Sequence, residues 1–142
     1  MYIPFIIVAA VIIIYVISIY NDLQKLKTQI VASIQEIGNQ LKRQASLIPN
    51  LQATVKGYLK HESSIFKMLT DARKAAEKAE QTGSSKDIDD AITQIQQAVP
   101  KLTIAVEDNP EMKADKSVAK FMNELTDTAH KLMYARRSVI DL

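Results

Sequence analysis

Residues 2–20 read YIPFIIVAAVIIIYVISIY, and this stretch decides the fold because it holds no charged residue and only one distinctly polar residue, Ser18. As an α-helix it would rise about 28 Å, which matches the hydrocarbon core of a bilayer, about 30 Å thick. The sequence therefore predicts a transmembrane helix at residues 1–20 and a soluble domain at residues 21–142. Two other interpretations fit less well. A cleaved signal peptide would begin with basic residues and end with small ones, and a buried core helix would need a larger domain around it.

The charges that flank this stretch predict its orientation. Every Lys, Arg, Asp and Glu follows Asn21, and Lys25 and Lys27 are the basic residues nearest to the apolar stretch. Positive charge beside a transmembrane helix favours the cytoplasmic side of the membrane. We therefore expect a single-pass membrane protein with its domain in the cytoplasm.

Composition narrows the class of the soluble part. About 120 residues suit one domain. A net charge of +2, with acids and bases interleaved, offers no basic face for nucleic acid. The absence of cysteine excludes a disulfide scaffold, a zinc ribbon and thiol catalysis. Three glycines and no tryptophan disfavour a β-rich fold, so we expect an all-α protein.

Apolar residues spaced by three and four predict amphipathic helices throughout the domain. The first such stripe, from Leu23 to Leu41, follows the apolar stretch without a break. The transmembrane helix is therefore expected to continue as one rod to about Leu47. Gly38 is the weak point of this rod, because glycine in a helix costs about 1 kcal/mol relative to alanine.

Pro49 predicts the end of this rod, or at least a kink, because a proline disfavours helical geometry in the residue before it. Asn50 can cap the helix that follows. That second helix carries an apolar stripe from Leu51 to Ala79, in which Glu62 is the one acid. Residues 81–85, QTGSS, are the clearest loop in the chain.

Ser84 or Ser85 is expected to cap a third helix, with apolar residues from Ile88 to Val106. Pro100 predicts a kink or an early end in this helix. After a turn that contains Asn-Pro, a last helix carries the stripe from Val118 to Val139. About four helices with short connections bury their stripes most simply in an elongated antiparallel bundle, into which the transmembrane helix continues.

Two histidines beside carboxylates raise the question of metal binding or acid–base chemistry. His61 precedes Glu62, and Asp127 is followed three residues later by His130. A di-iron bundle needs two Glu-x-x-His helices and two further glutamates, and the zincin pattern His-Glu-x-x-His is not completed after His61. We therefore expect no catalysis, no metal and no cofactor. A metal-binding or small-ligand-binding bundle around Glu62, His61 and His130 is the alternative.

Glu62 is the most unusual of these residues, because its position in the apolar stripe predicts burial. A buried carboxylate must be paired, hydrogen-bonded or protonated. Arg136, one residue past the stripe of the last helix, is a candidate partner. In the other interpretation, which we favour, the helix is rotated slightly and Glu62 lies at the edge of the bundle.

A longer motif identifies a family. Residues 41–62 read LKRQASLIPNLQATVKGYLKHE and closely resemble the LemA family hallmark LKRRxxLIPNLVxTVKGYxxHE. The resemblance extends to Tyr20-Asn21, to NPEMKA at residues 109–114, to Glu124 and to Ala135-Arg136. It implies a bacterial single-pass inner-membrane protein with a long helical bundle, no established enzymatic activity, and relatives among magnetosome membrane proteins.

Packing of the bundle does not explain the residue types in one part of this motif. We expect a contact with a partner or with another subunit there. This part comprises Lys56, Gly57, Tyr58, His61 and Glu62. The leading hypothesis is a membrane-anchored scaffold that associates helix to helix, either with itself as a homo-oligomer or with another membrane protein. A holin-like membrane-lesion protein is a further alternative, although its domain would be far larger than lysis needs.

Overall fold

The computed structural model describes residues 1–141, and in this part of the chain every regular element is a helix. The helices are α1 (Ile3–Val55), α2 (Ser63–Thr82), α3 (Ser85–Asp108), α4 (Pro110–Ala114) and α5 (Lys116–Asp141). The all-α prediction is confirmed. There are four long helices, as expected, and the short α4 is an addition just before the last one.

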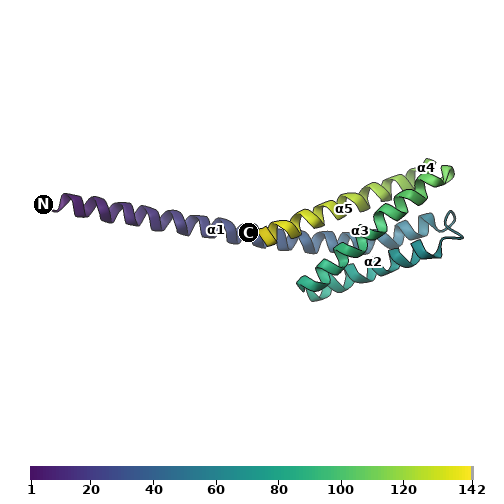
Figure 1. Cartoon of the computed structure of the whole chain (residues 1–142), viewed down its shortest axis with the longest axis horizontal. Helices are drawn as coiled ribbons and strands as arrows, with labels where there is room; N and C mark the ends of the chain where they lie inside the picture. The colour runs from purple at the N-terminus through teal and green to yellow at the C-terminus, as the bar shows by residue number, and fades with distance from the viewer. Residues whose placement is uncertain (142) are drawn as a thin grey trace.

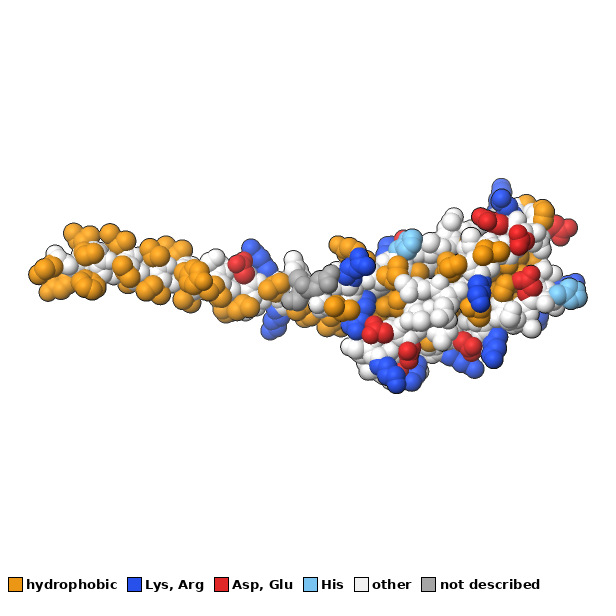
Figure 2. Space-filling model, viewed as in Figure 1, with side chains coloured by type: hydrophobic (Ala, Val, Ile, Leu, Met, Phe, Trp, Pro, Cys, Tyr) orange, Lys and Arg blue, Asp and Glu red, His pale blue; other side chains and the backbone are white. Residues whose placement is uncertain are grey.

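The N-terminal part of α1 projects from the rest of the molecule as a single helix (Figure 1). Pro4 lies in its first turn. The N–H groups of a first turn have no partner within the helix, so proline removes no hydrogen bond there. Its most apolar 18-residue window has a mean hydropathy of 2.8, and none of that window is buried in the structure. Figure 2 shows hydrophobic side chains along this part of α1. Within residues 1–141, α1 alone is long and apolar enough to cross a membrane.

α1 continues from this apolar part into the bundle as a helix of 53 residues, about 80 Å long. The continuous rod is confirmed, but the predicted end at Pro49 is wrong. An interior proline costs about 3 kcal/mol. Its neighbours Leu47, Ile48 and Leu51 are buried, and each such side chain contributes about 1.5–3 kcal/mol. Packing therefore outweighs the proline, and Asn50 lies inside the helix instead of capping a new one.

The chain reverses direction later than predicted, at residues 56–62, between α1 and α2. The expected single helix from Leu51 to Ala79 is therefore wrong. Leu59, in the middle of the turn, is buried and keeps the turn attached to the core. From there α2 runs back along α1 (Figure 1).

The loop predicted at residues 81–85 is present but shorter than predicted, because only Gly83 and Ser84 lie outside the helices. α2 ends at Thr82 and is capped by Gly83, whose φ of 61° is in the left-handed region that glycine adopts without strain. Ser84 is the cap of α3, because its side chain accepts a hydrogen bond from the Asp87 N–H. α3 then runs through Pro100 to Asp108, so the early end predicted at this proline is wrong.

The core consists of two clusters of buried apolar side chains, which we call near and far by their distance from the apolar N-terminal part. The near cluster contains Ile37, Leu41, Ala76, Ala79, Ile88, Ala91, Leu132 and Ala135. The far cluster contains Leu47, Ile48, Leu51, Val55, Leu59, Ile65, Leu69, Ala72, Ile95, Ala98, Leu102, Ala105, Met112, Val118 and Leu125. On α1 the buried residue between the two clusters is Gln44, and on α5 it is Thr128. The α1–α2 turn lies at the far end and contributes Leu59 to the far cluster.

Candidate functional site at the far end of the bundle

The turn of residues 56–62 contains five of the six predicted site residues, and it is an ordered element. The Tyr58 and Leu59 N–H groups both donate to the Val55 carbonyl, at 3.0 and 3.1 Å, and the Glu62 N–H donates to the Leu59 carbonyl at 3.1 Å. Lys56, Gly57 and His61 are exposed in this turn. These bonds fix the backbone, so the turn presents its exposed residues, which also include Lys60 and Glu62, in a defined arrangement.

Tyr58 joins the turn to the start of α5. Its hydroxyl donates to Asp115 Oδ2 at 2.8 Å, while Asp115 Oδ1 accepts from the N–H groups of Ser117 at 2.8 Å and Val118 at 3.3 Å. The tyrosine hydrogen bond, followed by the two backbone bonds, lowers the pKa of Asp115. The same hydrogen bond to a carboxylate raises the pKa of Tyr58. One side chain thus caps α5 and holds the turn.

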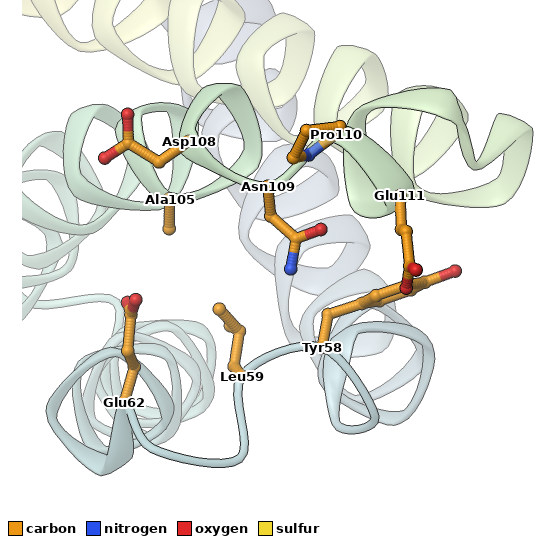
Figure 3. Close-up of a pocket in the computed structure, with 8 residues that line it drawn as sticks. All are labelled: Tyr58, Leu59, Glu62, Ala105, Asp108, Asn109, Pro110 and Glu111. Carbon is orange, nitrogen blue, oxygen red and sulfur yellow. The ribbon is translucent and has the colours of Figure 1, made fainter.

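An open hollow of about 600 Å³ lies between this turn and the junction of α3 with α4. In Figure 3, Leu59 and Glu62 point toward it from one side, Ala105 and Asn109 point toward it from the other, and Glu111 lies over Tyr58. Its lining is completed by Asp108 and Pro110. The charged residues of the lining are all acids, so the hollow favours positively charged groups over anions.

The structure separates Glu62 from Arg136. Glu62 is exposed at the residue before α2, so the burial that its place in the stripe predicts is wrong. Arg136 lies on α5, where its Nε and Nη2 donate to Asp89 Oδ1 at 2.8 Å and Oδ2 at 3.2 Å. The proposed Glu62–Arg136 pair is therefore wrong, and the interpretation that placed Glu62 at the edge of the bundle is the better one.

His130 is not brought together with His61 and Glu62, which are neighbours in the turn. Both His61 and His130 are exposed, and His130 lies about 22 Å along α5 from Asp115, the residue that bonds Tyr58. Among residues 1–141, no three His, Asp or Glu side chains are grouped so as to hold a metal ion. The described residues therefore contain no set of ligands that would support the metal-binding alternative.

Asp115 and the α3–α4 junction were not predicted as parts of this site. The junction falls in the segment 109–114 that carried part of the family resemblance, so a signal for it existed. Asp115 lies 57 residues from Tyr58, and no spacing rule connects two residues that meet only after the chain has reversed direction more than once.

Comparison with protein-family models gives a match to the LemA family over residues 33–141. The matched region begins inside α1, past its apolar part, and includes every residue of the near and far clusters. A comparison with curated proteins finds no match.

Proposed function

Because this chain belongs to the LemA family, we propose that it is a membrane-anchored scaffold that acts through helix–helix association, with itself or with another membrane protein. The observation that carries the proposal is the continuity of α1, which runs from Ile3 to Val55 without interruption. The same helix is the anchor and the longest helix of the bundle. The orientation of the anchor therefore determines the orientation of the bundle. Catalysis is not part of the proposal.

The length of α1 sets how far the turn is held from the membrane. From Asn21, where the apolar stretch ends, to Val55 the helix rises about 50 Å. Lys25 and Lys27 follow the apolar stretch, so we place the bundle on the cytoplasmic side of a bacterial inner membrane. The scaffold then presents the turn of residues 56–62 at a fixed height above the lipid.

The turn supports a role in contacting a partner because packing does not account for its glycine, Gly57. Gly57 does not have a positive φ, and a Cβ added there would meet nothing within 4 Å. Neither the backbone nor the neighbours require glycine at this position. A partner that approaches the backbone closely would require it.

Site-specific photo-crosslinking in intact cells tests this proposal. A photoreactive amino acid replaces Lys56 or His61 in the turn, and Lys101, exposed on α3, is the matched control position. We expect crosslinked species from the turn and few or none from Lys101. A second copy in the product identifies self-association, and a different membrane protein identifies a heterologous partner. Monomer alone from both turn positions would overturn the proposal.

Protease accessibility tests the orientation. Digestion of the bundle in inverted vesicles but not in cells with a permeabilised outer envelope is the expected result. The opposite pattern would place the turn on the outer side and would exclude cytoplasmic partners.

The small-ligand alternative has one observation in its favour, which is the acid-lined hollow beside Tyr58 and Glu62. It predicts that added divalent cations raise the melting temperature of metal-free full-length protein, and that Glu62→Gln weakens this effect. A melting temperature that does not respond to Mg²⁺, Ca²⁺, Mn²⁺ or Zn²⁺ excludes a divalent-cation ligand for the hollow.

A further inference from the structure

A polar layer crosses the core between the near and far clusters. Gln44 is fully buried, and neither its amide nitrogen nor its amide oxygen has a hydrogen-bond partner in the described part of the chain. Thr128, also fully buried, donates at 2.8 Å to the Leu125 carbonyl of its own helix, so this hydrogen bond does not join two helices. The two clusters therefore meet at a layer that contributes little cohesion between helices.

The near cluster is the weaker of the two. Four of its eight members are alanine, against three of fifteen in the far cluster, and alanine buries little apolar surface. A cavity of about 280 Å³ also lies at this end, lined by α1, the end of α2, the start of α3, the loop between them and α5. Its apolar lining includes Ile37, Leu41, Ala79, Ile88 and Val139. Less burial and looser packing reduce the free energy needed to open this end.

The tip of the α2–α3 hairpin is held together internally. The Asp87 carboxylate accepts from Thr82 Oγ1 at 2.7 Å and from Ser84 Oγ at 2.8 Å, and Lys78 Nζ lies 3.0 Å from it. These contacts join the end of α2 to the start of α3. The tip is therefore expected to move as one rigid unit.

An ion pair connects this tip to α5. Arg136 on α5 makes two hydrogen bonds to Asp89 on α3; the Asp89 side chain is 56% exposed and the Arg136 side chain is 15% exposed. Because the carboxylate is open to solvent, salt weakens the pair and its contribution is modest. In Figure 1 the α2–α3 loop stands away from the line of α1 and α5.

We propose that the tip of the α2–α3 hairpin, residues 76–91, opens away from α1 and α5 as a unit while the far cluster stays closed. The layer at Gln44 and Thr128 is the pivot, and the Arg136–Asp89 pair is the latch. The opening separates Ala76, Ala79, Ile88 and Ala91 from the α1 residues that they cover.

Opening of the tip extends an apolar face of α1. Leu23 and Ile34 are already more than half exposed, and Leu26 is partly exposed. Ile37 and Leu41 continue the same stripe but are buried in the closed bundle. The open state therefore offers one face from residue 23 to residue 41, about 27 Å long. Its use for association rests on the proposed function, whereas the opening itself does not.

Thiol labelling of single-cysteine variants tests the opening, because the chain contains no cysteine of its own. Ala76→Cys and Ala72→Cys lie about one turn apart on α2, on opposite sides of the layer. Ala91→Cys and Ala98→Cys, about two turns apart on α3, form a second pair across the layer. In full-length protein in detergent micelles, we expect the two near positions to react at least tenfold faster than the two far ones. Labelling at all four sites within threefold of one another would overturn the proposal.

The latch has a separate test. Arg136→Gln should accelerate labelling at Ala76→Cys and Ala91→Cys severalfold, as should 0.5 M salt, and should leave the two far positions unchanged. Equal acceleration at all four positions would show that the pair stabilises the whole bundle, and the latch would be excluded.

Amide hydrogen exchange of the unmodified protein tests the opening without any substitution, so folding defects in the variants cannot affect its result. Amides of residues 76–91 should exchange faster than those of residues 65–72 and 95–105. Equal protection of these segments would refute the opening even if the cysteine variants differed. A confirmed opening together with no crosslinked partner would keep this inference and remove the proposed function.

Discussion

Replacement of Gln44 by methionine should stabilise the protein. The Gln44 side chain is 0% exposed, and its amide nitrogen and oxygen have no hydrogen-bond partner within residues 1–141. A buried polar group left unpaired costs about 1–3 kcal/mol. Methionine is a flexible, unbranched side chain of similar length and has no such groups. The free energy of unfolding should therefore rise by about 1–3 kcal/mol, which corresponds to an increase of roughly 4–12 °C in the melting temperature of a domain of this size.

The assay is thermal unfolding of the full-length protein in mild detergent, followed by circular dichroism at 222 nm. The apolar part of α1 stays helical in the micelle and contributes a constant baseline. Gln35→Met is the matched control, because Gln35 is an exposed glutamine on the same helix. This control should change the melting temperature by less than about 2 °C, since surface substitutions usually change stability by less than 0.5 kcal/mol.

A lower melting temperature for Gln44→Met than for the unmodified protein would refute the reasoning. It would mean that Gln44 makes a polar interaction worth more than the burial of a thioether. Gln44→Ala separates this case from a simple packing defect. Loss of volume lowers stability in any case, so only a loss with methionine as large as the loss with alanine points to a polar role.

Four further predictions follow from particular contacts. Tyr58→Phe removes the hydrogen bond to Asp115 and should lower the melting temperature by a few degrees, with no change in helical content at 20 °C by circular dichroism. Hydrogen bonds from Thr82, Ser84 and Lys78 lower the pKa of Asp87 to about 2, so its contribution is complete above about pH 4 and is lost as the pH falls toward 2. Asp87→Asn should therefore show a smaller drop in melting temperature between pH 4 and pH 2 than the unmodified protein. Gly38→Ala, where an added Cβ meets nothing within 4 Å, should stabilise α1 by about 1 kcal/mol in denaturant titrations. A flexible Gly-Ser segment inserted after Asn21 should leave the melting temperature of the bundle unchanged but reduce crosslinking from the turn, and undiminished crosslinking would show that the rigidity of α1 is not used.

Much of the fold could be predicted from helical periodicity, and the errors have a common cause. Local rules predict that a helix ends or kinks at each proline, but both helices continue through Pro49 and Pro100. Packing of the neighbouring side chains offsets the free-energy cost at Pro49, and Pro100 is exposed to solvent. Apart from Glu62, the real turn at residues 56–62 has only Gly57 as a local signal. The apolar spacing continues through it because Leu59 still packs inward. In retrospect, Glu62 marked the interruption, since an acid in an otherwise apolar stripe indicates a change of direction as well as a buried pair.

The candidate site could be predicted only in part. The motif placed Lys56, Tyr58 and Glu62 in one segment, and the structure keeps them together in the turn. The partner of Tyr58 depends on how α5 begins beside that turn, which periodicity does not specify. The error over Arg136 has the same origin. The sequence predicts its position beside the α5 stripe, but the residue that faces it depends on the direction of the hairpin, and the chain reverses from residue 56 onward and not at residue 49.

The two clusters give α1 a gradient of stability along its length, and this gradient suits a scaffold. Ile37, the first buried residue of α1, lies about 24 Å from Asn21, and the far cluster begins at Leu47, about 15 Å further on. A force or steric load that enters through the apolar part of α1 therefore reaches the alanine-rich near cluster first. The far cluster, with its larger side chains, is separated from that load by the Gln44 layer. The near end can then change shape while the Tyr58–Asp115 contact stays intact, so the turn that we propose as the partner contact keeps its geometry.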